Sequence, residues 1–151
     1  MVNDLIDPSE RGVVIFKCVV AVGTEGQDPC HAVFGKEFHV GLGLHLEEVV
    51  RIHSEPAYPV YMIGFTPGFP FLGGLPEALH TPRLETPRTH VPEGSVGIAN
   101  AQTGVYPVAS PGGWRLIGRT PLRLFRPEAS RPFLYQAGVV TSIAMTFMPQ
   151  M

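Results

Sequence analysis

Residues 64–74 read Gly-Phe-Thr-Pro-Gly-Phe-Pro-Phe-Leu-Gly-Gly, and this stretch decides the class of fold. Proline presets φ and glycine accepts a positive φ, so Pro67-Gly68 predicts a tight turn. Gly73-Gly74 predicts either another sharp turn or a close approach of two backbone segments. Large apolar groups surround these turns at Phe65, Phe69 and Phe71. The stretch is typical of short strands joined by tight turns that need unusual backbone dihedral angles. It is equally typical of a loop packed on the end of a barrel.

The same composition continues along the chain, with nine glycines and eight prolines between residues 64 and 113. These residues alternate with large apolar ones, which a disordered segment would lack. Periodicity and β-branched or aromatic content predict strands at residues 13–22, 58–65, 91–99, 114–125 and 139–147. Short strands, tight turns and little helix predict a mainly-β fold, a closed or nearly closed barrel.

One helix is expected, from Leu46 to His53, because its apolar positions follow the i, i+3, i+4, i+7 rule. Glu47 and Arg51 have the spacing of an ion pair on the opposite face, and Pro56 is expected to end the helix. His53 lies on the apolar face, where a histidine is more often part of the core than a general base.

The overall composition excludes several classes of function. The chain has 151 residues and a net charge of −2, so no basic field is available to hold a phosphate backbone. The first residues lack the features of a signal peptide, and the apolar run from residue 13 to 22 is too short to span a bilayer. Cys18 and Cys30 are expected to be reduced thiols in a cytoplasmic protein.

No familiar catalytic or metal motif is present. The six histidines never adopt HExxH or HxH spacing, so no metal site is expected. Neither a nucleophile elbow nor a Walker A loop can be found. His90, which follows a second Thr-Pro-Arg unit, is the better candidate for an acid or base.

Two further segments carry candidate binding residues. Residues 81–88 contain Thr-Pro-Arg twice and are expected to form an extended ribbon, which presents Arg83 and Arg88 either to a carboxylate or phosphate or simply to solvent. Neutral hydrogen-bonding groups that suit a small polar ligand follow at Gln102, Thr103 and Tyr106. Arg119 is a further candidate for anion binding, although it and Trp114 are equally explained by packing and capping of a strand.

An ordered set of motifs carries a family resemblance: GFTPGFPFLGGL from Gly64, the Thr-Pro-Arg pair from Thr81, VPEGSVGIA from Val91, QTGVYP from Gln102 and PGGWRLIGRTP from Pro111. They resemble the family of the B-type 5-oxoprolinase subunit, which is also called allophanate hydrolase subunit 1 or the sporulation-kinase inhibitor. They are also similar to the matching part of the carboxyltransferase half of urea carboxylase. The resemblance covers about Gly43 to about Gly138.

This resemblance implies a cyclophilin-like β-barrel, here residues 56–151, preceded by a small α+β segment, here residues 1–55. The first 42 residues fit the family pattern poorly, so the α+β segment is expected to be shortened. The neutral run after Gly138 replaces the family's Gly-Asp and basic strand. The resemblance also implies a companion of homologous fold (the C-type 5-oxoprolinase subunit), a small amide or lactam substrate, and ATP used through the complex.

Three functions follow as alternatives. In the first, the chain is part of an ATP-dependent 5-oxoprolinase or related amide hydrolase, inactive without its partner. Arg83, Arg88 and Arg119 would then bind anionic groups, with Gln102, Thr103 and Tyr106 positioning the amide. In the second, it is a binding protein that inhibits a histidine kinase without catalysis. The third, a prolyl isomerase, rests on fold analogy alone.

Overall fold

The computed structural model describes residues 13–21 and 43–148, and within them the fold is mainly β with one short α-helix, as predicted. No helix in these ranges is long and apolar enough to cross a membrane. The elements, in chain order, are β1 (Val13–Ala21), α2 (Leu46–Ser54), β2 (Ala57–Ile63), β3 (Pro70–Gly73), the 3₁₀ turn η2 (Glu77–Leu79), β4 (Arg88–Val91), β5 (Ser95–Ala99), β6 (Gln102–Val105), β7 (Ser110–Gly112), β8 (Arg115–Arg119) and β9 (Val140–Met148).

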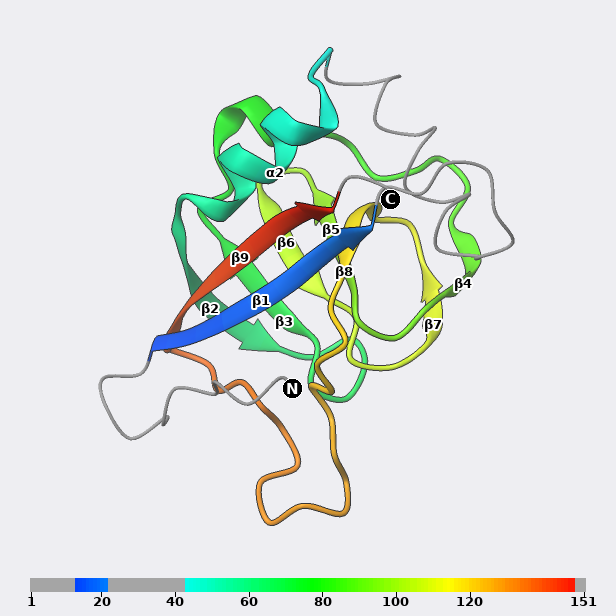
Figure 1. Ribbon diagram of the computed structural model, residues 1–151. Coiled ribbons are helices and arrows are strands. Elements are labelled where there is room, and N and C mark those ends of the chain that lie inside the picture. The colour runs from blue at the N-terminus through cyan, green and yellow to red at the C-terminus, as the bar shows by residue number, and fades with distance from the viewer. Residues whose placement is uncertain (1–12, 22–42, 149–151) are drawn as a thin grey trace.

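The strands close into a barrel. Six of them run antiparallel in the order β8-β5-β6-β3-β2-β9, and β1 completes the circle between β9 and β8. Strand β1 is parallel to β9 over its whole length, from Val13 opposite Val140 to Ala21 opposite Met148. These two strands cross the front of the molecule side by side, while β4 and β7 form a separate two-stranded ribbon beside the barrel (Figure 1).

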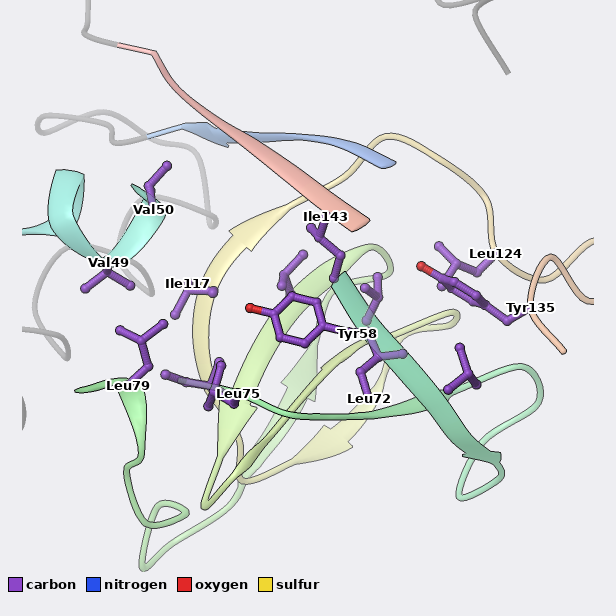
Figure 2. Packing of buried hydrophobic residues seen from close by; sticks show 14 residues of the cluster. Val49, Val50, Tyr58, Leu72, Leu75, Leu79, Ile117, Leu124, Tyr135 and Ile143 are labelled. Atoms are coloured by element: carbon purple, nitrogen blue, oxygen red, sulfur yellow. The ribbon is translucent and has the colours of Figure 1, made fainter. Parts of the chain in front are cut away.

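Strand β5 is buried on both faces because the sheet separates two apolar clusters. Val96 and Ile98 point into the barrel, whereas Ala99 belongs to a cluster on the outer face. The inner cluster fills the barrel beneath α2, with Tyr58 at its centre and Tyr135 and Leu124 at its far end (Figure 2). Because side chains alternate along each strand, one sheet contributes both to the cluster inside the barrel and to the cluster on its outer face.

The helix predicted from the apolar pattern is present as α2, and it covers one end of the barrel (Figure 1). Val49 and Val50 are buried in the inner cluster. The backbone N–H of His45 donates to Glu48 Oε2 at 3.2 Å, which satisfies an otherwise unpaired donor at the start of the helix. Arg51 pairs with Glu55 at 2.8 Å instead of with Glu47, so the predicted partner was wrong.

Two predicted strands differ from the observed ones. Residues 91–99 divide into the end of β4 and the whole of β5, because the chain turns at Gly94, whose φ is +82°. Residues 114–125 contain only β8, although Leu122, Arg123 and Leu124 still alternate between buried and exposed. Strands β3, β6 and β7 were not predicted, because at three or four residues each is too short to show a period.

Substitution of Gly94 tests how much the close backbone contact with Thr120 contributes to the stability of the barrel. Its N–H donates to the Tyr106 carbonyl, its carbonyl accepts from the Thr120 N–H, and an added Cβ would collide with the Thr120 carbonyl. We expect Gly94→Ala to lower the free energy of unfolding by about 3 kcal/mol or more, since it adds a clash to the strain of a positive φ. Chemical denaturation measures the loss.

Gly138→Ala is the matched control, because Gly138 has a φ of +87° but open space around it. It should cost only the conformational strain, about 1 kcal/mol. Equal losses in the two variants would show that the contact with Thr120 does not matter.

Candidate functional site

A pocket of about 310 Å³ opens on the outer face, between the barrel and the ribbon of β4 and β7. Its lining combines aromatic walls, glycine backbone and one guanidinium. The lining residues are Phe65, Phe69, Phe71, Arg83, Pro87, Tyr106, Pro111, Gly112, Gly113 and Trp114. All of them fall within the motifs that carried the family resemblance.

The walls are built around Phe69, which is buried. Its ring meets those of Tyr106 and Trp114 edge to face, with centroids 5.2 and 5.4 Å apart, and lies 4.9 Å from Phe71. Such edge-to-face contacts are the favoured geometry of aromatic pairs. The rings therefore form a fixed apolar wall.

Three glycines make room for these rings. A Cβ on Gly104 would lie 2.8 Å from the Phe69 ring, and a Cβ on Gly97 would lie 3.1 Å from Trp114 Cβ. A Cβ on Gly112 would overlap the Tyr106 hydroxyl. The glycines of these motifs are thus required for space beside the sheet, which explains why the stretch is so rich in them.

The polar groups in and around the pocket come from the extended segment of residues 81–88 and from Tyr106. The guanidinium of Arg83 lies 5.9 Å from the centre of the Trp114 ring. Arg88 Nη1 donates to the Trp114 carbonyl at 2.8 Å. The Trp114 N–H donates in turn to the Tyr106 hydroxyl. The backbone of Trp114 therefore holds the side chains of both Arg88 and Tyr106.

Burial raises the pKa of Tyr106, although the Trp114 hydrogen bond and the charges of Arg88 and Arg83 act in the opposite direction. Burial has the larger effect because the phenolate would have to be desolvated. At neutral pH the pocket therefore contains a neutral O–H donor close to two cations.

The structure brings together Arg83, Arg88 and Tyr106, three of the seven predicted site residues. His90 is exposed on β4, and Arg119 Nε donates to the Glu93 carbonyl at 2.9 Å at the end of β8. Gln102 is half-buried at the start of β6, opposite Gly73 and Ala99. None of these three belongs to the pocket lining.

Thr103 faces the barrel interior. Its hydroxyl donates to the Gly97 carbonyl at 3.1 Å, so the 2.8 Å contact with His53 must be a bond donated by His53 Nε2–H to Thr103 Oγ1. His53 is fully buried, and its Nδ1 has no hydrogen-bond partner within the described residues. Burial lowers the pKa of His53 to about 3, so it is a neutral core histidine, as predicted from its helix face.

Sequence reasoning placed the three phenylalanines around the turns but did not identify Phe69, Phe71 and Trp114 as the walls of a pocket. The available signal was the repeated combination of an aromatic residue with a glycine two or three positions away. Phe65, at the rim, is 69% exposed and has a φ of +67°. A residue with a strained backbone and an exposed aromatic side chain is often found at a binding site.

This pocket is small for a nucleoside triphosphate. The pocket is at the small end of the range for organic ligands. No group of three or more His, Cys, Asp or Glu side chains comes together in residues 13–21 and 43–148 to hold a cation. The pocket suits a small anion with an apolar body.

Comparison with known proteins supports the family suggested by the motifs. The model of the carboxyltransferase domain, subdomain C and D, matches residues 37–135. The B-type 5-oxoprolinase subunit of Haemophilus influenzae is 64% identical over 92 residues, covering 61% of this chain and 43% of that protein. Its counterpart in Escherichia coli O157:H7 is 54% identical over 108 residues, covering 72% of this chain and 48% of that protein. The chain therefore spans less than half the length of these curated relatives.

Solved structures share the fold. An uncharacterised protein from Pyrococcus horikoshii superposes with a TM-score of 0.73 at 44% identity, covering 88% of this chain and 59% of that one. The urea amidolyase of Kluyveromyces lactis gives a TM-score of 0.62 at 17% identity, covering 88% of this chain and 9% of that one. The second likeness concerns the fold alone.

The buried His53 predicts a pH dependence of stability. Its pKa is lower in the folded state than the ordinary value of 6.5, so the unfolded chain binds the additional proton. We expect the free energy of unfolding to fall as the pH drops from about 6.5 towards 3, by at most about 1.4 kcal/mol per pH unit from this group. Urea denaturation at a series of pH values measures it.

His53→Gln is the comparison, because glutamine keeps an N–H donor for Thr103 but does not titrate in this range. The difference in stability between the two proteins should be flat above pH 7 and should narrow below 6.5. Parallel curves down to pH 4 would contradict the assignment.

Proposed function

Because the chain belongs to the family of B-type 5-oxoprolinase subunits, with the carboxyltransferase domain's subdomains C and D as its matched unit, we propose that it serves in an ATP-dependent 5-oxoprolinase. The reaction would open the lactam of 5-oxoproline to give glutamate. The single observation that supports this most is the pocket, which places Arg83 and the Tyr106 hydroxyl beside aromatic walls. A related amide-hydrolysing or urea-carboxylase-type complex is the wider class.

The proposal includes a companion of homologous fold, the C-type 5-oxoprolinase subunit. Supporting it, large apolar side chains are exposed along β2 and the following turn: Tyr61 is 64% exposed, Met62 53% and Phe65 69%. Exposed apolar side chains grouped in this way are typical of a protein interface. Phe65 also lines the pocket, so a companion bound at these side chains would lie next to it.

ATP enters the proposal through the complex. We assign no step of nucleotide chemistry to the described residues of this chain. What this chain contributes is an exposed cation beside Trp114, at Arg83, and a neutral hydrogen-bond donor, at Tyr106, for the substrate.

The remaining predicted residues have lesser proposed roles. His90 and Arg119 are exposed and would act only where the companion meets them. Gln102 and Thr103 belong to β6, and Tyr106 directly follows this strand in the chain. They would help to position Tyr106. The kinase-inhibitor alternative predicts no use for the Arg83–Tyr106 pocket, and it stays a prediction.

The resemblance also leads us to propose that residues 56–151 are a cyclophilin-like barrel and that residues 1–55 are a shortened α+β segment. In this division β1 would be a strand that the segment contributes to the barrel. The pairing of β1 with β9 supports such a contribution. Residues 1–12 and 22–42 lie outside the described residues.

The test is to co-express the chain with its companion proteins and to measure glutamate released from 5-oxoproline with and without ATP. We expect release only when ATP and the whole complex are present. Arg83→Gln should lower kcat/KM by about ten-fold or more, because a charge-assisted hydrogen bond is lost.

Arg126→Gln, at an exposed arginine outside the pocket lining, is the matched control and should match the wild type. If the assembled wild-type complex releases no glutamate, the proposed function is wrong. If it is active and Arg83→Gln has no effect, the pocket has no part in the reaction.

A further inference from the structure

We propose that this chain by itself binds the substrate, with Arg83 contacting a carboxylate and the Tyr106 hydroxyl donating to the amide carbonyl of a small ring. The inference rests on the proposed function and deepens it, because it assigns substrate recognition to this chain before any companion is bound. The ligand class is a five-membered cyclic amide that carries one carboxylate. The structure supports it through the shape of the pocket, the state of Tyr106 and the anchoring of Arg83.

The shape of the pocket fits a small ring. Its volume of about 310 Å³ is bounded by the rings of Phe69, Phe71 and Trp114 and by the backbone of Gly112 and Gly113. The apolar faces of a flat ring can lie against these aromatic side chains without losing hydrogen bonds, because those faces make none in water. An extended or highly polar ligand would be desolvated there without compensation.

The Tyr106 hydroxyl is prepared to donate. Its oxygen already accepts the Trp114 N–H, and burial keeps its proton in place. The oxygen lies against Gly112, where a Cβ would overlap it, so the hydroxyl cannot move into the ribbon. A carbonyl oxygen on the ligand is the acceptor that completes this arrangement.

The backbone around Arg83 is anchored on both sides. Arg115 Nε donates to the Pro82 carbonyl at 3.0 Å, and the Leu84 N–H donates to the Gly113 carbonyl at 2.8 Å. The guanidinium itself lies above the Trp114 ring. A planar guanidinium with its backbone fixed in this way suits a carboxylate, which it can meet with two parallel hydrogen bonds.

Arg88 is a positioning residue and not a ligand contact. Its Nη1 is engaged by the Trp114 carbonyl at 2.8 Å, and it is not part of the pocket lining. Its bond holds the same peptide segment whose N–H holds Tyr106. Arg88 therefore fixes the start of β4 relative to Trp114, which lies between β7 and β8.

The isolated chain contains its own spectroscopic reporter. Trp114 is its one tryptophan, and it forms a wall of the pocket. Its fluorescence, and the single indole N–H signal in a ¹⁵N-correlated NMR spectrum, can be followed during titration with 5-oxoproline. Parallel titrations use 2-pyrrolidinone, which lacks the carboxylate, cyclopentanecarboxylate, which lacks the amide, and ATP.

We expect a saturable change with 5-oxoproline in the absence of any companion. Arg83→Gln should weaken binding of 5-oxoproline about ten-fold or more and leave 2-pyrrolidinone unaffected. Tyr106→Phe should weaken both lactams and leave cyclopentanecarboxylate unaffected. Arg126→Gln should leave all three ligands unaffected.

The inference is overturned if wild-type chain shows no saturable change with 5-oxoproline, or if ATP alone produces the change. It is also overturned if Arg83→Gln binds 5-oxoproline as well as the wild type does. An assembled complex that converts 5-oxoproline while the isolated chain fails to bind it would leave the proposed function standing without this inference. Binding by the isolated chain together with an inactive complex would do the reverse.

Discussion

Phe69, Tyr106 and Trp114 can pack directly against the outer face of the barrel only where the strands below them carry no side chain. Gly97 on β5 and Gly104 on β6 provide that space, and Gly112 on β7 provides it for the Tyr106 hydroxyl. Most other features of the pocket depend on this contact. The extended segment of residues 81–88 is held beside the barrel through Trp114, because the Arg83 guanidinium lies near the Trp114 ring and Arg88 donates to the Trp114 carbonyl. The high glycine content, which at first suggests weak structure, instead permits close packing of large rings against the sheet.

The two faces of the sheet treat polar groups differently. Inside the barrel, His53 Nε2–H donates to Thr103 Oγ1 and the Thr103 hydroxyl donates to the Gly97 carbonyl. The histidine is neutral because burial disfavours its charged form. On the outer face, two arginines lie close to a tyrosine whose proton is retained through burial. The polar pair inside the barrel therefore links α2 to β6, whereas Arg83 and Tyr106 on the outer face line the pocket.

Much of the fold could be predicted from the sequence, since the helix at residues 46–53 and the two long terminal strands have strong patterns. The short strands could not, because three or four residues show no period and glycine hides the apolar face. The site was predicted in part. Thr103 and Tyr106 were grouped together, yet they are an odd number of positions apart, so alternation along the strand places them on opposite faces. Arg119 was grouped with Arg83 by residue type alone, but its Nε donates to the Glu93 carbonyl at the end of β8, outside the pocket lining.

The parallel pairing of β1 with β9 has a consequence for how the protein is made. The first described strand has as its full-length partner the last one, so their contacts are among the most distant in sequence that the chain can form. Bringing such distant segments together carries a large loop-closure entropy, which must be offset by structure already formed between them. During synthesis β1 leaves the ribosome well before β9 and stays without that partner until β9 has been made. Closure of the barrel between β1 and β9 is therefore expected late in folding, and until then β1 has an unpaired edge that is open to aggregation or to chaperones.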